Sequence, residues 1–201
     1  MTIALIDYGA GNLRSVHNAL VAAGAQDVAV TADPDVVAKA GRIVLPGVGA
    51  FAACMNGLSA IAGLVEAMER RVRGEGAPFL GICVGMQLLA DAGEEHGTHR
   101  GLGWIAGTVR AFDPAPGLRI PHMGWNDVVP VGDHPVIAAG EAYYLHGYHF
   151  ADAVDVAATS SHGATFVAAV AKDNIVGVQY HPEKSQAYGL ATLERFLSWL
   201  P

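Results

Sequence analysis

The stretch Phe79-Leu80-Gly81-Ile82-Cys83-Val84-Gly85-Met86-Gln87 decides the fold that we expect for this chain. Its first four residues predict a buried strand, and the residues from Val84 onward predict the start of a helix. Glycines on both sides of Cys83 permit a sharp strand-to-helix turn whose central side chain points outward as a nucleophile. The helix dipole and the free N–H groups at the helix start favour the thiolate of Cys83. The alternative is a structural cysteine buried between packing glycines, since free cysteine is commonly buried.

Strand-like and helical patterns alternate in the rest of the first half of the chain. Short β-branched runs at residues 3–6, 28–30 and 43–45 are separated by helical stretches at 13–23 and 34–40, and an alanine-rich helical stretch follows at about 50–72. Such alternation is typical of strand–helix–strand units, which build a parallel sheet with helices on its faces.

The second half of the chain has a different pattern. Short alternating runs, separated by Gly, Pro and Asp, predict antiparallel or mixed strands at residues 104–112, 143–150, 153–160, 165–171 and 175–180. A last helix is expected from about Ser185, with one stripe that packs on the core, formed by Leu190, Leu193, Leu197 and Leu200. Because no interdomain linker interrupts these patterns, we expect a single α/β domain over residues 1–201. Its mixed, mostly parallel central sheet is flanked by helices and accompanied by a smaller antiparallel sheet portion.

Composition narrows the class of protein. The chain has 201 residues, of which 52% are hydrophobic and 15% charged, and its formal net charge is −7. The high hydrophobic fraction excludes intrinsic disorder, and an acidic balance without a basic block argues against nucleic-acid binding. No uncharged apolar run reaches the roughly 18 residues of a membrane span, and the first residues do not resemble a signal peptide. We therefore expect a cytoplasmic protein with no membrane partner, in which Cys54 and Cys83 are free thiols and Cys54 is a small core residue.

A second group of reactive residues lies in Gly177-Val178-Gln179-Tyr180-His181-Pro182-Glu183. Side chains two positions apart on a strand point to the same face, so His181 and Glu183 share a face. The carboxylate can then accept one imidazole N–H and leave the other ring nitrogen to exchange a proton with a thiol, as in a catalytic triad. For this segment alone, the alternative is a surface histidine beside a solvated acid. The elbow cysteine favours the triad.

A third segment, Leu45-Pro46-Gly47-Val48-Gly49-Ala50-Phe51, follows a predicted strand and carries two closely spaced glycines. Backbone of this kind can approach a ligand and direct N–H groups at it, which would supply one half of an oxyanion hole. The alternative is a phosphate-binding loop. Neither the Lys-Ser/Thr pair of a P-loop nor the third glycine of a dinucleotide fingerprint follows, so the oxyanion loop is favoured.

These three segments together resemble the motifs of the triad (class I) glutamine amidotransferases. The resemblance runs from about residue 3 to residue 200. Further stretches resemble, within that family, the glutaminase subunits that serve a cyclase of histidine biosynthesis. These stretches are Asp7-Tyr8-Gly9-Ala10-Gly11-Asn12-Leu13, Pro121-His122-Met123-Gly124-Trp125-Asn126 and His181-Pro182-Glu183-Lys184-Ser185.

The resemblance implies a mechanism. Cys83 attacks the carboxamide carbon of L-glutamine, and backbone N–H groups of Val84 and of the Gly47-Val48-Gly49 loop hold the oxyanion. His181, oriented by Glu183, protonates the leaving ammonia and then activates the water that releases glutamate. In this family the loop is thought to be set by the partner, and Val48 between two glycines is suited to a peptide that rotates.

The resemblance also implies contacts with the substrate and with a partner. The substrate-binding positions are Gln87, Glu95, His146, Gly147 and Tyr148, although the family usually has a hydroxyl-bearing residue at the position of Gly147. A side-chain contact is lost there, while the backbone can still bind the substrate carboxylate. The stretches that contact the partner contain Asn12, Met123, Trp125 and Lys184. The alternatives are a solvated helix end for Glu95, a core loop for Trp125 and a solvated charge for Lys184.

The expected activity is hydrolysis of glutamine to glutamate and ammonia. The ammonia passes within a heterodimer to a (β/α)8-barrel cyclase, which makes imidazole glycerol phosphate and an aminoimidazole carboxamide ribonucleotide. The alternatives are a glutaminase subunit of another synthase, such as anthranilate synthase, and a non-catalytic docking subunit. The sequence indicates no cofactor and no metal, because His96 and His99, like His146 and His149, lack further ligands at a suitable spacing.

Overall fold

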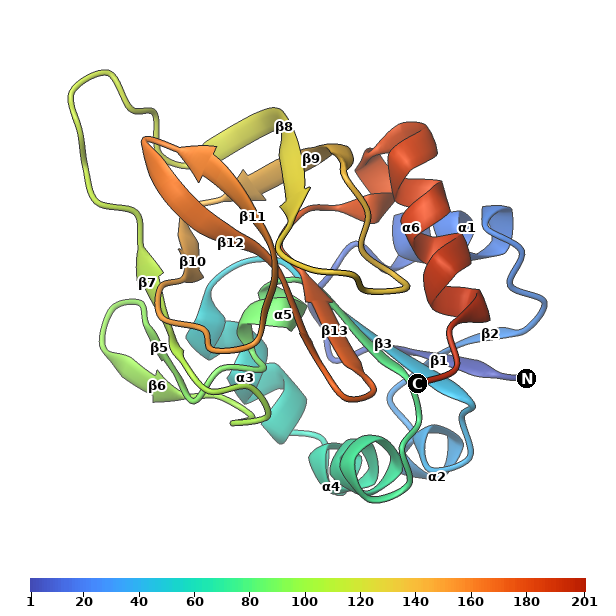
Figure 1. The fold of residues 1–201 in the computed structure, drawn as a ribbon. Helices are drawn as coiled ribbons and strands as arrows, with labels where there is room; N and C mark the ends of the chain where they lie inside the picture. Colours follow the sequence, from blue (N-terminus) through green and yellow to red (C-terminus); the bar gives the residue numbers. More distant parts are fainter.

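The computed structural model describes all 201 residues, Met1–Pro201, as two β-sheets with helices packed on the larger one (Figure 1). The larger sheet has nine strands in the order β2-β1-β3-β4-β13-β12-β11-β8-β9, and the smaller has four in the order β10-β7-β5-β6. This arrangement confirms the α/β class and the mixed central sheet with a smaller second sheet.

One half of the large sheet is parallel. It consists of β1 (Ile3–Ile6), β2 (Val28–Thr31), β3 (Arg42–Gly47), β4 (Phe79–Cys83) and β13 (Ile175–Val178). All of these strands except β2 are buried along their whole length, as expected for parallel strands with helices on both faces. Because β13 pairs with β4, the C-terminal part of the chain lies beside the elbow segment.

Helices cover both faces of this parallel half (Figure 1). One face carries α1 (Leu13–Ala22) and α6 (Gln186–Ser198), and the other carries α2 (Pro34–Val37), α3 (Phe51–Ser59) and α4 (Leu64–Glu69), which continues into a π-helical turn, η1 (Arg70–Gly74). No single helix has the length and apolar character of a membrane span. The pair formed by α3 and the α4–η1 segment, bent by 93°, meets that requirement by length and composition alone.

The predicted apolar stripe of the last helix is correct except at its end. Leu193 is buried, and Leu190 and Leu197 pack against the core. The prediction for Leu200 is wrong, because α6 ends before Trp199, whose backbone is extended, and Leu200 is exposed to solvent.

The other half of the large sheet is antiparallel and contains β12 (Ala164–Lys172), β11 (Val156–His162), β8 (His122–Pro130) and β9 (Gly140–His146). The strand predicted at 143–150 is divided at Gly147. β9 ends there, and β10 (Tyr148–Phe150) joins the smaller sheet with β7 (Thr108–Ala111), β5 (Ala92–Glu94) and β6 (Thr98–Arg100). The chain therefore passes from one sheet to the other at Gly147.

Three strands, β5, β6 and β8, are not predicted by the sequence. β5 and β6 are only three residues long. In β8 the usual pattern is inverted, because the polar His122 is buried while Met123, Trp125 and Val129 are exposed. Polar residues facing inward hide the alternation on which a strand prediction rests.

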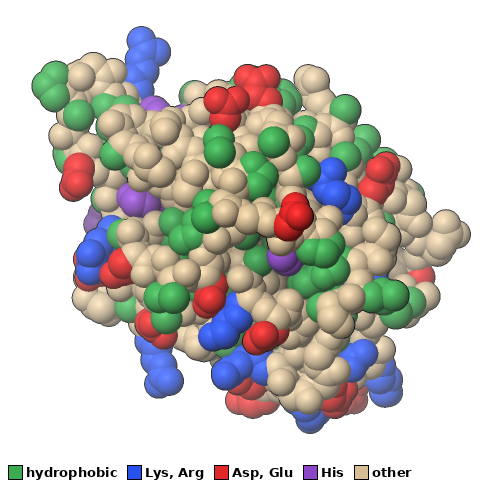
Figure 2. Space-filling model, viewed as in Figure 1, with side chains coloured by type: hydrophobic (Ala, Val, Ile, Leu, Met, Phe, Trp, Pro, Cys, Tyr) green, Lys and Arg blue, Asp and Glu red, His purple; other side chains and the backbone are tan.

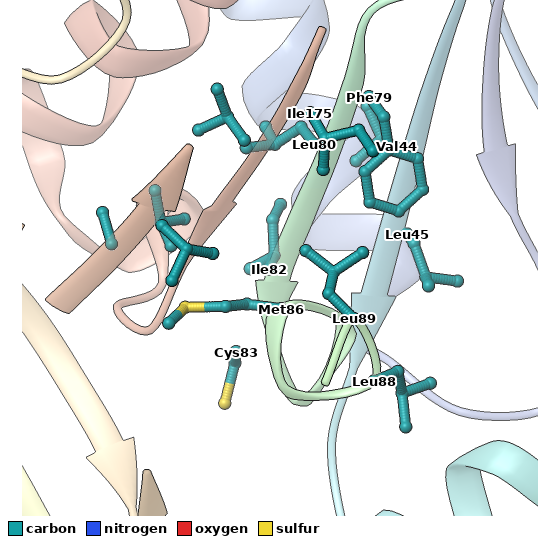
Figure 3. Packing of buried hydrophobic residues seen from close by; sticks show 14 of the residues in the cluster. Val44, Leu45, Phe79, Leu80, Ile82, Cys83, Met86, Leu88, Leu89 and Ile175 are labelled. Carbon is teal, nitrogen blue, oxygen red and sulfur yellow. The ribbon is translucent and has the colours of Figure 1, made fainter. Parts of the chain in front are cut away.

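The apolar core is continuous around β3, β4 and β13. Figure 3 shows side chains of these strands packed together: Val44, Leu45, Phe79, Leu80, Ile82 and Ile175. The core thus fixes the positions of the carboxyl ends of the three strands, where the candidate site lies.

Acidic and basic side chains are interspersed over the face of the molecule seen in Figure 2.

Candidate active site

Cys83 occupies a strained turn between β4 and α5 (Val84–Gln87). Its backbone has φ +55° and ψ −112°, a conformation that non-glycine residues rarely adopt and that often marks a functional site. A Cβ on Gly85 would overlap the carbonyl oxygen of Leu45, so only glycine lets the helix start so close to β3. In Figure 3 the sulfur of Cys83 points away from the packed side chains of β4. The geometry is that of the predicted nucleophile elbow.

The sheet register brings the three predicted segments together. Gly47 pairs with Cys83 at the carboxyl ends of β3 and β4, and Val178 of β13 pairs with Ile82. His181 follows three residues after Val178, at the same edge of the sheet. Open α/β sheets bind their ligands outside the carboxyl ends of the strands.

His181 and Glu183 form a buried pair. The distance between Nδ1 of His181 and Oε1 of Glu183 is 2.9 Å, and the two side chains are 3% and 1% exposed. Nδ1–H therefore donates to the carboxylate, and Nε2 is left for the cavity. Burial opposes the charge on His181, but hydrogen bonds and charges of Cys83 and Glu183 outweigh it and raise the pKa of His181 to about 10. The imidazole is thus protonated at neutral pH.

A cavity of about 290 Å³ opens over this pair. This volume lies just below the range typical of pockets for drug-sized ligands, so it suits a molecule as small as an amino acid. Most of the predicted site residues line it, namely Val48, Gly49, Cys83, Val84, Gln87, Glu95, His146, Gly147, Tyr148, His181 and Lys184. Gly47 and Glu183 lie behind this wall, in contact with it through the strand register and through His181.

The Gly47-Val48-Gly49 loop presents free N–H groups. Neither the N–H of Val48 nor that of Gly49 donates a hydrogen bond within the chain. Two side chains hold the carbonyl groups of the same segment: the Tyr8 hydroxyl donates to Pro46 O at 2.7 Å, and Cys54 Sγ donates to Val48 O at 3.4 Å. Cys54 is buried, as predicted, but it also contacts the loop, which the sequence alone does not reveal.

The predicted substrate-binding residues also line the cavity. Glu95 accepts a hydrogen bond from Phe51 N at 2.7 Å, so its carboxylate is held at the start of α3. Nδ1–H of His146 donates to Tyr148 O at 2.9 Å, and its Nε2 lies 3.4 Å from His122 Nδ1. Both ring nitrogens of His146 are therefore occupied, and burial lowers its pKa to about 3, so this side chain is neutral.

Gly147 has a free backbone N–H group at the cavity lining. Its N–H donates to no acceptor of the chain, while its carbonyl accepts from Phe112 N. A Cβ at this position would make only ordinary contacts with Ile120 and Pro121, so nothing in the structure requires a glycine there. The free N–H fits the expectation that backbone, rather than side chain, meets a substrate carboxylate.

Of the four residues predicted to contact a partner, Lys184 lines the cavity and the other three lie outside its lining. Met123 and Trp125 are exposed on β8, at 66% and 44%. The Trp125 ring meets Tyr143 edge-on at 6.1 Å, and Lys184 Nζ lies 5.9 Å from the centre of the Tyr143 ring. Asn12, at the start of α1, makes no side-chain hydrogen bond, and α1 packs against the η2 turn (Pro182–Lys184).

Gln179 is a site residue that the sequence reasoning missed. It is fully buried, and its Nε2 lies 3.8 Å from Cys83 Sγ. The prediction that strand alternation places His181 and Glu183 on one face is wrong, because β13 ends at Val178 and Glu183 lies in the 3₁₀ turn η2, which brings its carboxylate to Nδ1 of His181. No group of three or more His, Cys, Asp or Glu side chains is arranged to hold a metal ion.

Comparison with known proteins defines the class of protein. The model of the glutamine amidotransferase class-I family matches residues 4–198. Among solved structures, the glutaminase domain of CTPS from Trypanosoma brucei has a TM-score of 0.68 at 17% sequence identity, covering 98% of this chain and 92% of that one, which shows the shared fold. The fold and the family match together define a class-I glutamine amidotransferase.

Two curated relatives narrow this class. Imidazole glycerol phosphate synthase subunit HisH from Zymomonas mobilis is 58% identical over 206 residues, covering 100% of this chain and 97% of the relative. The subunit of the same name from Caulobacter vibrioides is 53% identical over 212 residues, covering 100% and 99%. The chain belongs to the class-I glutamine amidotransferases and, within them, to the HisH subunits of imidazole glycerol phosphate synthase. It is therefore an enzyme of the glutaminase type that the sequence predicts.

Proposed function

We propose that this chain hydrolyses L-glutamine with Cys83, His181 and Glu183 and passes the ammonia to a (β/α)8-barrel cyclase bound as a heterodimer. One observation carries the proposal: Cys83, His181, Val48 and Gly49 line one cavity, and the N–H groups of Val48 and Gly49 donate to no acceptor of the chain. Acyl transfer needs these three components, a nucleophile, an acid–base group and oxyanion donors. A docking subunit without activity needs none of them.

In the first half-reaction the Cys83 thiolate attacks the carboxamide carbon of glutamine. The oxyanion that forms accepts hydrogen bonds from the N–H of Val84 and from the Gly47-Val48-Gly49 loop. The imidazolium of His181 then gives its Nε2 proton to the departing nitrogen. Ammonia leaves, and a glutamyl thioester remains on the sulfur.

In the second half-reaction His181 is neutral and serves as the base. It takes a proton from water, the resulting hydroxide attacks the thioester carbon, and the sulfur leaves as the thiolate. Glutamate is released, and the thiolate–imidazolium pair is restored. Glu183 keeps Nδ1 protonated throughout, so that Nε2 always faces the reaction.

The cavity offers groups of the right charge for the two polar ends of glutamine. The Glu95 carboxylate and the Gln87 carboxamide line the same cavity and suit the α-ammonium group. The free N–H of Gly147 suits the α-carboxylate. His146 contributes its backbone rather than its occupied ring nitrogens.

The partner surface that we propose is the exposed strip with Met123 and Trp125, bordered by Lys184. Aromatic residues and Met are enriched at interface centres. Docking there would enclose the cavity mouth beside Lys184, and an enclosed path keeps ammonia from being protonated by water. The names of the relatives support a cyclase as acceptor, with imidazole glycerol phosphate and an aminoimidazole carboxamide ribonucleotide as products. Because Cys83 must stay reduced, we propose a cytoplasmic location.

The test is ammonia release from glutamine by the chain alone, with the cyclase, and with the cyclase and its nucleotide substrate. We expect little release from the lone chain and an increase by orders of magnitude in the loaded complex, because a misaligned oxyanion donor costs about 10²–10³ in rate. The Cys83→Ala complex should lose glutamine hydrolysis and keep synthesis from added ammonium. Retained hydrolysis in Cys83→Ala would overturn the proposal.

A further inference from the structure

A pair of buried carboxamides links the cavity wall to the nucleophile. Nε2 of Gln87 lies 3.0 Å from Tyr148 O and 3.0 Å from Oε1 of Gln179. Nε2 of Gln179 lies 3.8 Å from Cys83 Sγ. Gln87 is 3% exposed and Gln179 is fully buried, so neither amide can turn to water.

The Tyr148 carbonyl fixes the orientation of both amides. A carbonyl oxygen only accepts hydrogen bonds, so Gln87 must turn its NH₂ group toward it. The second hydrogen of that NH₂ group then meets Gln179, which must offer its oxygen. Gln179 is left with its own NH₂ group facing the sulfur of Cys83. Each step follows from the step before it, and a flip of either amide would set two acceptors or two donors against each other.

The position of Gln179 is rigid. Its backbone N–H donates to Ala168 O on β12 at 2.9 Å, immediately after β13 ends. Two residues later, His181 N donates to Tyr143 O. The backbone between β13 and the His181–Glu183 pair is therefore fixed at both of these residues, and the carboxamide of Gln179 is held in turn by its burial and by its hydrogen bond from Gln87.

We propose that Gln179 is a positioning residue of the glutaminase reaction, which directs an N–H group at the Cys83 sulfur and turns the Gln87 oxygen into the cavity. This proposal rests on the proposed function, in which Cys83 is the nucleophile. An N–H donor favours the thiolate over the thiol, because it stabilises the charged form. Both hydrogens of the Gln87 NH₂ group are used within the chain, so its oxygen is the group left to act on the cavity, which Gln87 and Glu95 both line. The Gln87 oxygen and the Glu95 carboxylate are both acceptors, and acceptors bind an ammonium group.

Two substitutions separate these effects. Gln179→Glu keeps the length of the side chain and an oxygen toward Gln87 but replaces the donor at the sulfur by an acceptor. Gln179→Met keeps the length and removes both polar groups. Gln26→Met, at an exposed glutamine, is the control for the change from Gln to Met.

The primary measurement is the pH dependence of Cys83 alkylation by iodoacetamide, followed on the Cys83 peptide by mass spectrometry, so that Cys54 does not interfere. This reaction reports the thiolate and needs neither glutamine nor an oxyanion hole. The second measurement is kcat and KM for glutamine in the complex with the cyclase and its nucleotide. Urea unfolding of each variant shows separately whether it is destabilised.

We expect the acid limb of Cys83 alkylation to move up by about one pH unit in both variants, the size of a tenfold change in thiolate population. KM for glutamine should rise about tenfold in Gln179→Met, where Gln87 keeps its hydrogen bond to Tyr148 O but loses the second one that holds its oxygen toward the cavity, and stay within about twofold of the wild-type value in Gln179→Glu. Gln26→Met should match the wild type in both measurements. If alkylation profiles and KM values of both variants coincide with the wild type, Gln179 is only structural and the proposal fails. Loss of the proposed function itself would instead appear as hydrolysis by Cys83→Ala, which leaves the alkylation comparison unaffected.

Discussion

Nδ1 of His181 and Oε1 of Glu183 are 2.9 Å apart, in a pair of side chains that solvent hardly reaches. Together with Cys83, this carboxylate holds the pKa of His181 at about 10 against the effect of burial. The folded-state pKa is thus above the unfolded value of about 6.5. The pair therefore stabilises the fold fully below about pH 6.5, and this contribution is lost as the pH rises through about 10.

Glu183→Gln is predicted to lower the pKa of His181 and to shift the alkaline limb of kcat/KM for glutamine to lower pH by at least about one unit. The amide can also stabilise the wrong imidazole tautomer, so kcat should fall by about 10²–10⁴. The pH–rate profile of the cyclase complex measures both effects. Glu194→Gln, at an exposed glutamate of α6, is the control and should match the wild type. An unshifted alkaline limb in Glu183→Gln would show that the carboxylate does not set this pKa.

How far the sequence predicts this site depends on whether a contact is local. The elbow at Cys83 and the pairing of His181 with Glu183 involve residues within a few positions of each other, so glycine placement and close spacing reveal them, although the pairing is made in the η2 turn and not by strand alternation. The bond between Gln87 and Gln179 joins residues 92 positions apart, and that between Gln179 and Cys83 spans 96. Such contacts depend on the pairing of β13 with β4, which no local pattern shows.

Gly85→Ala is predicted to destabilise the protein by at least about 2 kcal/mol, because the new methyl group would overlap the Leu45 carbonyl oxygen and backbone cannot yield as a side chain can. For a chain of this length the melting temperature should fall by roughly 4–8 °C. Calorimetry measures the change. Gly132→Ala is the matched control, since no atom lies within 4 Å of the added Cβ, and it should change stability by less than about 0.5 kcal/mol. Equal melting temperatures for the two variants would contradict this account of the elbow.

Tyr8→Phe is predicted to lower kcat for glutamine about tenfold with KM nearly unchanged. The substitution removes only the hydroxyl that donates to Pro46 O, which loosens a loop that the proposed mechanism assigns to the oxyanion rather than to the bound substrate. Burial raises the pKa of Tyr8, so this hydroxyl is a donor at every working pH. Steady-state kinetics of the complex give the two constants.

The control for Tyr8 is Tyr188→Phe, which removes a comparable hydrogen bond to Ala138 O, outside the active-site cavity. It should cost about 1 kcal/mol of stability, like Tyr8→Phe, but leave kcat unchanged. Alkylation of Cys83 by iodoacetamide should be the same in both variants, because that reaction forms no oxyanion. A fall in kcat for Tyr188→Phe of the same size would mean that the effect comes from stability alone.

Trp125→Ala is predicted to weaken association with the cyclase by about 2 kcal/mol, close to 30-fold in Kd, because an exposed aromatic residue at the centre of an interface usually contributes this much. Titration calorimetry of the two subunits measures the affinity. Val154→Ala changes an apolar residue outside the proposed strip that is more exposed than Trp125, at 76% against 44%, and it should bind the cyclase like the wild type. If Trp125→Ala binds the cyclase with wild-type affinity, the docking surface does not lie on this part of β8.

β8 also shows why part of the fold escapes prediction. Its outward residues Met123 and Trp125 are apolar, and its inward residue His122 is polar, so the local pattern points to the wrong face. The buried position of His122 is explained by its contacts with side chains of neighbouring strands. His122 stacks on His162 at 4.2 Å and lies 3.4 Å from Nε2 of His146, which comes from β9. Neighbouring strands thus supply the hydrogen bonds that make a buried histidine acceptable.

From the cluster of His122, His146 and His162 we predict that the protein loses stability at acid pH. Burial, and next the charge of His162, lower the pKa of His122 to about 4, whereas the unfolded chain titrates near 6.5. Below about pH 6.5 the unfolded state therefore binds a proton that the folded state does not bind. The contribution of His122 to the free energy of unfolding is complete above about pH 6.5 and is lost as the pH falls through about 4. His122→Gln keeps a donor for His146 and should reduce the slope of unfolding free energy between pH 6.5 and 4.5 by up to about 1.4 kcal/mol per pH unit, measured by urea unfolding. His96→Asn, at an exposed position with φ +55° that asparagine tolerates, should leave the slope unchanged. If the free energy of unfolding of His122→Gln depends on pH as steeply as that of the wild type, His122 is not the group that titrates.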